Sequence, residues 1–151
     1  LLLGAREAGQ PVLMGGGSQM LAVLALALAT LTPDSRSDFV SEISIGTTAW
    51  LAEERIDQSR GSFALESLMN SVGKHFGVEL VGFATGLHFH SSRHQPLRDY
   101  ELGYVKEGVG AGALALLAQL KGCSLHRLVQ ACDLAMDQIV SVSKRSAKSD
   151  I

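Results

Sequence analysis

Two glycine-rich turns, each followed at once by an almost wholly apolar segment, constrain the fold of this chain most. The first turn spans residues 15–17 and leads into residues 19–31, and the second spans residues 108–112 and leads into a segment that ends at Gly122. A helix that is apolar on every side needs neighbours on every side. Glycine lets a backbone or a ligand come close because it has no side chain. We therefore expect two buried helices that begin at sites of close approach.

Short apolar runs alternate with helical patterns along the rest of the chain. We expect strands at residues 11–14, 39–47 and 78–89, with a surface connection at residues 32–38. Strands that alternate with helices favour a parallel sheet covered by those helices. The predicted fold class is therefore α/β, a three-layer Rossmann-like domain with a mainly parallel sheet and helices on both faces.

Two further helices are expected from apolar residues at helical spacing. One covers residues 63–76 and ends at Gly77, and Ser124 is expected to cap the other. Ser18 is expected to cap residues 19–31 in the same way. The apolar stripe of the last helix is formed by Leu125, Leu128, Val129, Cys132, Ala135, Met136 and Ile139.

Composition and charge narrow the class of protein. The formal net charge is −2 and basic residues cluster only in the tail, so nothing favours nucleic acid as a partner. The apolar run at residues 20–31 is shorter than the ~20 residues that cross a bilayer. Cys123 and Cys132 lack the CxxC spacing of a redox or zinc site. We expect a cytoplasmic protein with free thiols and no membrane contact.

The chain begins at Leu1 in a stretch that reads as the last turns of a helix already under way. We therefore expect residues 1–143 to be the C-terminal part of a single α/β domain whose N-terminal part is missing. Residues 144–151 are polar and are expected to form a disordered tail.

The turns at the ends of the predicted strands are expected to meet at one rim, where parallel sheets bind ligands. The glycines of residues 15–17, with Ser18, suit a phosphate at a helix start, although a tight packing turn fits them equally. Thr47 and Thr48 offer hydroxyl groups at the end of the second strand. Such threonines also commonly end a strand and cap the next turn or helix.

Glu107 stands directly before the second glycine turn. A carboxylate at a helix start stays ionised, because the helix dipole places positive charge there. If it faces a pocket it can act as a general base. Alone, the same pattern also fits an acid that only complements the dipole.

A run of histidines precedes Glu107, with His88, His90 and His94 in the pattern HxHxxxH. On a strand His88 and His90 would share a face, which allows a zinc site. Histidines that line a pocket for an anionic substrate, with Ser91 and Arg93 beside them, are the preferred interpretation. A polar surface loop is the third.

Two motifs carry a resemblance to a known family. The segments KEGVGAGALAL and GGGSQMLAVLALALA resemble those of nicotinate-nucleotide:dimethylbenzimidazole phosphoribosyltransferases, the CobT family, and most closely a divergent branch of it. The resemblance covers the chain from about Pro11 to about Gly122. It implies transfer of a phosphoribosyl group from nicotinate mononucleotide to a benzimidazole-like or purine base, in the synthesis of the lower ligand of cobamides (vitamin B12).

The resemblance also implies roles for residues and partners. Glu107 matches the general base of the family, and neither a cofactor nor a metal is implied. The partners would be the two small-molecule substrates and a second copy in a homodimer. The residues expected to bind substrate are Gly15, Gly16, Gly17, Ser18, Thr47, Thr48, His90, Ser91, Gly108 and Gly110.

The sequence departs from the family in two places. The interval before Glu107 lacks the family's usual histidine pattern, which leaves the acceptor base open. The segment EISIGTTA is similar to the family's phosphate loop but comes after the first glycine turn instead of before it. The phosphate loop is then expected in the missing N-terminal part, so this part alone would be inactive. Two alternatives stand, a non-catalytic nucleotide-binding module and a metal-dependent hydrolase built on the histidine run.

Overall fold

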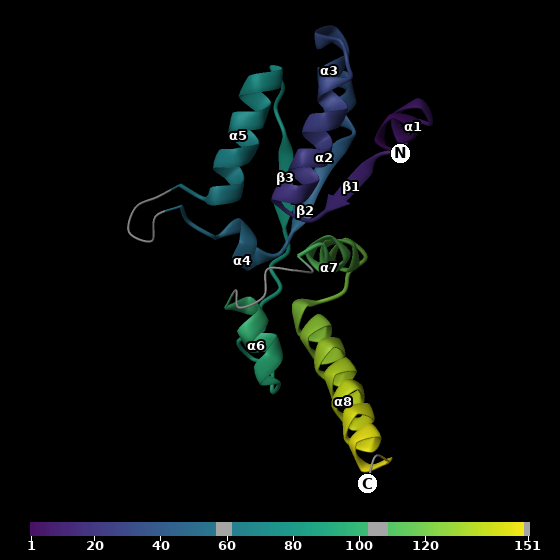
Figure 1. The fold of residues 1–151 in the computed structure, drawn as a ribbon, viewed down its shortest axis with the longest axis vertical. Helices are drawn as coiled ribbons and strands as arrows, with labels where there is room; N and C mark the ends of the chain where they lie inside the picture. The colour runs from purple at the N-terminus through teal and green to yellow at the C-terminus, as the bar shows by residue number, and fades with distance from the viewer. Residues whose placement is uncertain (57–61, 103–108, 150–151) are drawn as a thin grey trace.

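The structure, a computed structural model, describes residues 1–56, 62–102 and 109–149, the last seven of these for the backbone alone. Along these residues, helices are interspersed with the three strands of a small sheet (Figure 1). Their order is α1 (Leu2–Glu7), β1 (Val12–Gly15), α2 (Ser18–Ala29), α3 (Pro33–Ser41), β2 (Ile43–Thr47), α4 (Ala49–Ala52), α5 (Ala64–Phe76), β3 (Val81–Ala84), α6 (Gln95–Glu101), α7 (Ala111–Leu120) and α8 (Leu125–Ser149).

The three strands form a parallel sheet in the order β1-β2-β3. Gly15 pairs with Gly46, and Gly46 pairs with Phe83 on its other side. Both connections between strands carry helices, as the alternating sequence pattern predicts. The predicted α/β fold, with a parallel sheet and helices on both faces, is confirmed.

One face of the sheet is buried against α2, α3 and α5 and forms the main core. Met14, Ile43 and Ile45 point to this face from β1 and β2, because alternate residues of a strand share a face. The buried helical residues of this core are Leu21, Leu24, Leu28, Phe39 and Val40. Met69, Val72 and Phe76 of α5 pack against them, as the helical spacing of residues 63–76 predicts.

The other face is crossed by α7 at the carboxyl ends of the strands (Figure 1). A Cβ atom on Gly46 would lie only 3.0 Å from the Cβ of Ala113, and one on Gly112 would overlap the backbone of Thr47 and Thr48. The glycines of the second turn therefore allow a helix to rest directly on the backbone of β2.

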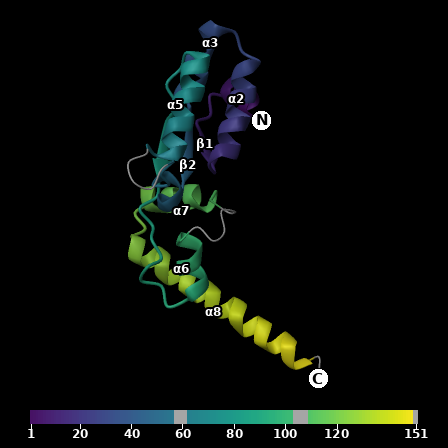
Figure 2. The same ribbon diagram turned by 60° about the vertical axis from the view of Figure 1, so that its left-hand side comes forward.

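A second, smaller core lies beyond α7, where α6 and α8 meet the segment after β3. Its buried residues are Leu87, Phe89, Ala115 and Val129. Figure 2 shows α6 beside the first part of α8, while the rest of α8 extends away from the sheet. Ser124 accepts a hydrogen bond from the Arg127 N–H at 3.4 Å, which agrees with its predicted capping role.

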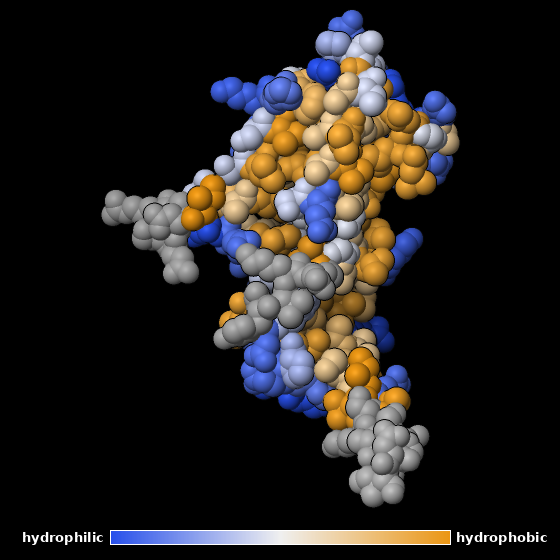
Figure 3. All heavy atoms as spheres, in the orientation of Figure 1, coloured by the Kyte–Doolittle hydropathy of each residue, from blue (hydrophilic) through white to orange (hydrophobic). Residues whose placement is uncertain are grey.

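Two helices are less covered than the sequence predicts. Leu26 of α2 is 71% exposed and Leu120 of α7 is 80% exposed, although both helices are apolar on every side. Within the described residues each helix has neighbours on one side only. Figure 3 accordingly shows hydrophobic residues over much of the sheet-bearing half of the molecule.

The predicted connection at residues 32–38 is wrong, because these residues open helix α3. Pro33 occupies its first turn, where the missing N–H of proline costs nothing. The predicted strand at residues 39–47 is therefore too long. Phe39 and Val40 are buried from the end of α3, and β2 begins only at Ile43.

The predicted strand at residues 78–89 is also too long, since β3 covers only Val81–Ala84. One more sheet-like bond comes after it, from the Thr85 N–H to the Thr47 carbonyl oxygen at 3.0 Å. Leu87 and Phe89 then leave the sheet for the smaller core. His88 and His90 consequently do not lie on a strand.

Two smaller differences and one agreement concern helix ends. Gly17 is the N-cap of α2 and Ser18 is its first residue, so the predicted capping role of Ser18 is wrong. Gly77 does end α5, in the left-handed conformation that favours glycine (φ 71°). Helix α8 continues to Ser149, through most of the segment predicted as a disordered tail. Among the described helices none is long and apolar enough to span a membrane.

The contact between α7 and β2 generates a stability prediction. Gly112→Ala places a methyl group inside the backbone of Thr47, so α7 must shift and we expect a loss of roughly 3 kcal/mol in the free energy of unfolding. Urea denaturation measures this loss. Gly4→Ala is the matched control, since nothing lies within 4 Å of its new Cβ and alanine favours a helix. Equal midpoints for the two variants would contradict the packing role.

Candidate functional site

The carboxyl ends of β1 and β2 meet the start of α7, as the sequence predicts for the rim of the sheet. A Cβ atom on Gly15 would lie 3.0 Å from the Gly110 carbonyl oxygen, and Gly112 sits against the backbone of Thr47 and Thr48. Four of the predicted site residues, Gly15, Thr47, Thr48 and Gly110, are thereby brought together. Ligands in parallel α/β sheets bind beyond this edge.

A largely apolar pocket of about 250 Å³ opens beside this contact, and we call it the aromatic pocket. It lies between the segments after β2 and β3 and helices α6, α7 and α8. Its lining residues are Thr48, Trp50, Thr85, Leu87, Phe89, Tyr100, Ala111, Gly112, Leu114, Ala115, Leu128 and Cys132. Pockets for drug-sized ligands measure ~300–1,000 Å³, so this smaller pocket suits one compact ring system.

Three aromatic rings form one side of the aromatic pocket. The ring centroids of Trp50 and Tyr100 lie 5.0 Å apart in an edge-to-face arrangement, and those of Trp50 and Phe89 lie 5.9 Å apart. Such rings offer a rigid apolar surface with defined geometry. The aromatic wall of the pocket can therefore pack against the flat ring of a ligand.

Three buried polar atoms at this edge lack a hydrogen-bond partner within the described residues: Thr47 Oγ1, Thr48 Oγ1 and Trp50 Nε1. Thr47 and Thr48 are only 2% and 1% exposed. An unsatisfied buried donor costs ~1–3 kcal/mol, and native proteins contain few of them. Thr85, in contrast, donates to Gln119 Oε1 at 2.5 Å. A ligand that forms hydrogen bonds with these three orphaned atoms would therefore gain the most binding free energy.

The titratable groups in the aromatic pocket are held in their neutral forms. Burial raises the pKa of the Tyr100 phenol. Burial, together with the charge of Asp133, raises the pKa of the Cys132 thiol. Because a nucleophilic cysteine needs a lowered pKa, Cys132 serves as an apolar wall. The pocket therefore suits a neutral aromatic ligand.

The segment that carries Phe89 into the pocket is fastened by a carboxylate from α6. Glu101 accepts a hydrogen bond from the Phe89 N–H at 2.5 Å, and its other oxygen lies 2.6 Å from His88 Nδ1. This double contact fixes the backbone on which the Phe89 ring is mounted.

Two carboxylates from α8 fasten the next part of the same segment. The buried Asp133 accepts a hydrogen bond from Ser92 Oγ at 2.5 Å and pairs with Arg93 at 3.2 Å. The exposed Asp137 pairs with Arg93 and lies 3.0 Å from His94 Nε2. The hydrogen bond from Arg93 lowers the pKa of Asp137, and the same bond raises the pKa of Arg93. The polar segment thus joins α6 to α8.

The residues of the histidine run differ in their surroundings. His88 and His94 each face a carboxylate, while His90 and Ser91 are exposed and outside the lining of the aromatic pocket. In the described ranges no three His, Cys, Asp or Glu side chains are placed to hold a metal ion together.

The first glycine turn is filled by protein. A Cβ atom on Gly16 would lie 2.6 Å from Met20 Cγ, and one on Gly17 would lie 2.5 Å from Leu51 Cδ2. Ser18 is exposed at the start of α2. Close packing against these two side chains therefore explains why glycine is needed at both positions. Glu107 and Gly108 lie outside the described residues.

Sequence reasoning missed the aromatic wall and the carboxylates that support it. The chain has one tryptophan, two tyrosines and five phenylalanines, and three of these eight rings meet in the aromatic pocket. Their scarcity is a signal that could have drawn attention to Trp50 and Tyr100. Nothing in the spacing of Asp133 or Glu101 indicates the segment that each one holds.

Comparison with known proteins finds relatives named UPF0284 protein. The chain is 63% identical over 143 residues to the one from Prochlorococcus marinus strain MIT 9313, which covers 95% of this chain and 36% of that protein. It is 54% identical over 137 residues to the one from Parasynechococcus marenigrum strain WH8102 (89% and 34%). The relative from Gloeobacter violaceus strain PCC 7421 is 39% identical over 128 residues (85% and 31%).

The chain therefore spans about a third of the length of the curated relatives it matches. Their shared name states no activity. No family model matches the chain.

The carboxylate that holds Ser92 gives a prediction. Asp133→Ala leaves the Ser92 hydroxyl and the Arg93 guanidinium without their buried partner, so we expect a loss of ~2–3 kcal/mol in stability. Faster proteolytic cleavage near residues 90–95 should accompany it. Asp137→Ala is the control, because it removes a neighbouring but exposed partner of the same arginine. If both variants lose stability equally, burial of Asp133 is not what fastens the segment.

Proposed function

We propose that this chain is part of a longer UPF0284 protein that transfers a phosphoribosyl group from nicotinate mononucleotide to a benzimidazole-like or purine base. In this proposal the product enters the lower ligand of a cobamide, as the motif resemblance implies. The observation that carries the proposal is the aromatic pocket at the carboxyl edge of the sheet, beside the start of α7. That is the position where a parallel α/β sheet binds its ligand.

The acceptor base is assigned to the aromatic pocket. A bicyclic heterocycle is flat and neutral, and the pocket offers about 250 Å³ between aromatic rings and the small residues Ala111, Gly112 and Ala115. The raised pKa values of Tyr100 and Cys132 keep charge away from it. Nicotinate mononucleotide is larger and carries a phosphate, so it would bind outside this pocket.

Glu107 is assigned the role of general base. It precedes Gly110, the N-cap of α7, by three positions, and the next two residues, Ala111 and Gly112, line the pocket. The ring nitrogen of the base attacks the anomeric carbon of the ribose as the bond to nicotinate breaks. The bonding electrons leave with nicotinate, and the carboxylate accepts the N–H proton of the base.

The charge of Glu107 serves the same step electrostatically. The attacking base becomes cationic as its new bond forms, and a carboxylate beside it stabilises that charge. The leaving nicotinate starts as a cationic pyridinium and departs neutral at its ring nitrogen. The step therefore balances without a metal ion.

The orphaned atoms of the pocket bear on which base it accepts. Trp50 Nε1 can only donate a hydrogen bond, and Thr48 Oγ1 can donate or accept. A purine presents ring nitrogens with lone pairs, whereas a dimethylbenzimidazole presents methyl groups on the corresponding edge. The proposal therefore favours a base with an acceptor atom on its buried edge.

The other substrate and the partner belong to the whole protein. We assign the phosphate-binding loop to the two thirds of the relatives' length that this chain does not cover. Ser18, His90 and Ser91 are exposed and remain candidates for contact with the nucleotide. Exposed leucines on α2 and α7 support the further proposal of a homodimer.

The base role of Glu107 is tested by Glu107→Gln in the full-length protein. Glutamine keeps the size of the side chain but cannot take the proton, so release of nicotinate should slow by ~100-fold or more. Glu53→Gln, which changes an exposed acid at the end of α4, is the control and should leave turnover unchanged. Undiminished turnover in Glu107→Gln rejects the base. Tight binding of nucleotide and base with no product from the unmodified protein would favour a binding module.

The assignment of the pocket is tested separately by Trp50→Phe. Phenylalanine keeps an aromatic wall but removes the orphaned N–H, so kcat/KM for adenine should fall about tenfold. The value for 5,6-dimethylbenzimidazole should stay the same or rise. Competition between the two bases in one assay measures the ratio. An equal fall for both bases would show that Trp50 shapes the pocket without reading the base.

A further inference from the structure

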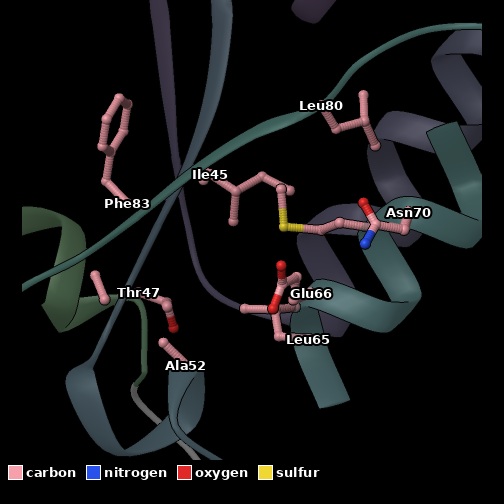
Figure 4. A pocket seen from close by; sticks show the side chains of 11 residues that line it. Ile45, Thr47, Ala52, Leu65, Glu66, Asn70, Leu80 and Phe83 are labelled. Atoms are coloured by element: carbon pink, nitrogen blue, oxygen red, sulfur yellow. The ribbon is translucent and has the colours of Figure 1, made fainter. Parts of the chain in front are cut away.

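A second hollow lies on the opposite side of β2, between β3 and α5, and we call it the sheet-edge groove. Its volume is about 370 Å³. Figure 4 shows the side chains that surround it, from β2 and β3 on one side and from α5 on the other. Its lining residues are Ile45, Thr47, Ala52, Leu65, Glu66, Met69, Asn70, Leu80, Gly82, Phe83 and Ala84. The proposed phosphoribosyl transfer does not use this groove.

Three polar side chains converge on the sheet-edge groove. Glu66 and Asn70 are one turn apart on α5, so they project from the same face of the helix. Thr47 lines the groove from β2, and its buried hydroxyl has no hydrogen-bond partner within the described residues. An unsatisfied hydroxyl on a residue that is only 2% exposed indicates a missing partner.

The charge of the groove limits what that partner can be. Among the described residues that line it, Glu66 alone is ionisable, and a carboxylate disfavours a phosphate or another carboxylate beside it. Lys74 borders a neighbouring hollow on α5 but not this one. An ionised carboxylate accepts hydrogen bonds only, while the Asn70 amide and the Thr47 hydroxyl both donate and accept. A pair of neutral hydroxyl groups, which also donate and accept, matches this set.

The rest of the lining is apolar and suits a ring. Ile45, Leu65 and Leu80 border the space beside the polar groups (Figure 4). Gly82 opens the sheet side of the groove, since a Cβ there would meet the Met69 methyl at 3.0 Å. A ligand with a flat apolar body and a hydroxyl-bearing end fits both parts.

We propose that the sheet-edge groove binds a neutral nucleoside through the two hydroxyl groups of its ribose. Glu66 accepts a hydrogen bond from one or both hydroxyls, as carboxylates do for ribose in other α/β folds. Asn70 and Thr47 complete the contacts, and the base lies against the apolar wall. Hydrogen bonds to a charged acceptor are the strong ones, so Glu66 contributes most to the affinity.

The groove is separate from the aromatic pocket, although consecutive residues line the two. Thr47 belongs to the groove and Thr48 to the aromatic pocket, because the backbone is still extended at Thr48 and successive side chains of an extended chain point to opposite sides. This site does not depend on the proposed transfer reaction. A ligand here can occupy the protein whether or not a base occupies the other pocket.

Calorimetry of the full-length protein with adenosine tests the proposal. We expect 2′,3′-dideoxyadenosine, which lacks the hydroxyl pair, to bind about tenfold or more weakly than adenosine. Glu66→Gln should weaken the binding of adenosine by a similar factor. Thr47→Val should also weaken it, while the stability of the protein stays equal or rises because an orphaned hydroxyl is removed.

Glu79→Gln is the matched control, since it changes an exposed acid that lies outside the lining of the groove. It should leave the affinity for adenosine unchanged. Three results would overturn the proposal: no adenosine binding up to about 10 mM, equal binding of the dideoxy compound, or loss of binding in Thr48→Val, which changes the aromatic pocket, but not in Glu66→Gln. Tighter binding of tryptamine that Glu66→Gln abolishes would also overturn it, since the groove would then select a cation. None of these results bears on turnover in Glu107→Gln.

Discussion

The direct seating of α7 on the backbone of β2 is the contact on which the rest of the structure depends. It is made by Gly112 against Thr47 and Thr48, and by Gly110 against Gly15. A side chain on either of these two glycines would hold the helix away from the strand ends. Because α7 lies so close, its first turn forms one wall of the aromatic pocket. The position of the pocket therefore depends on the absence of side chains at a few residues.

The opposite wall depends on buried charge. Phe89 and Leu87 leave the sheet on a segment with no regular structure of its own, and two carboxylates, one from α6 and one from α8, hold it. Glu101 fixes the backbone of Phe89, and Asp133 fixes Ser92. Removing one partner of a buried charged contact leaves the other unsatisfied, so this wall is rigid only while both acids are in place. A segment held from two helices can position an aromatic ring accurately.

The sequence predicts the fold class and the meeting of the strand ends, because period, order and glycine turns are local signals. It starts the second strand too early, at Phe39 instead of Ile43. Apolar residues such as Phe39 and Val40 fit a strand and the buried end of a helix equally well. It predicts that Leu26 and Leu120 are covered, whereas both are exposed, because burial depends on neighbours that no local pattern reveals. The sequence does not indicate the supporting roles of Glu101 and Asp133 either. The partner of Asp133 is remote in the chain, and Glu101 and Phe89 form no recognisable motif.

The central claim is that one carboxylate faces a flat base held in the aromatic pocket. A crystal structure of the full-length protein with adenine bound tests it most directly. The account predicts a ring beside Trp50 and Ala115, with a ring nitrogen within about 2.6–3.2 Å of the Glu107 carboxylate. A base bound elsewhere, or a Glu107 side chain turned to bulk water while the pocket is filled, would contradict it.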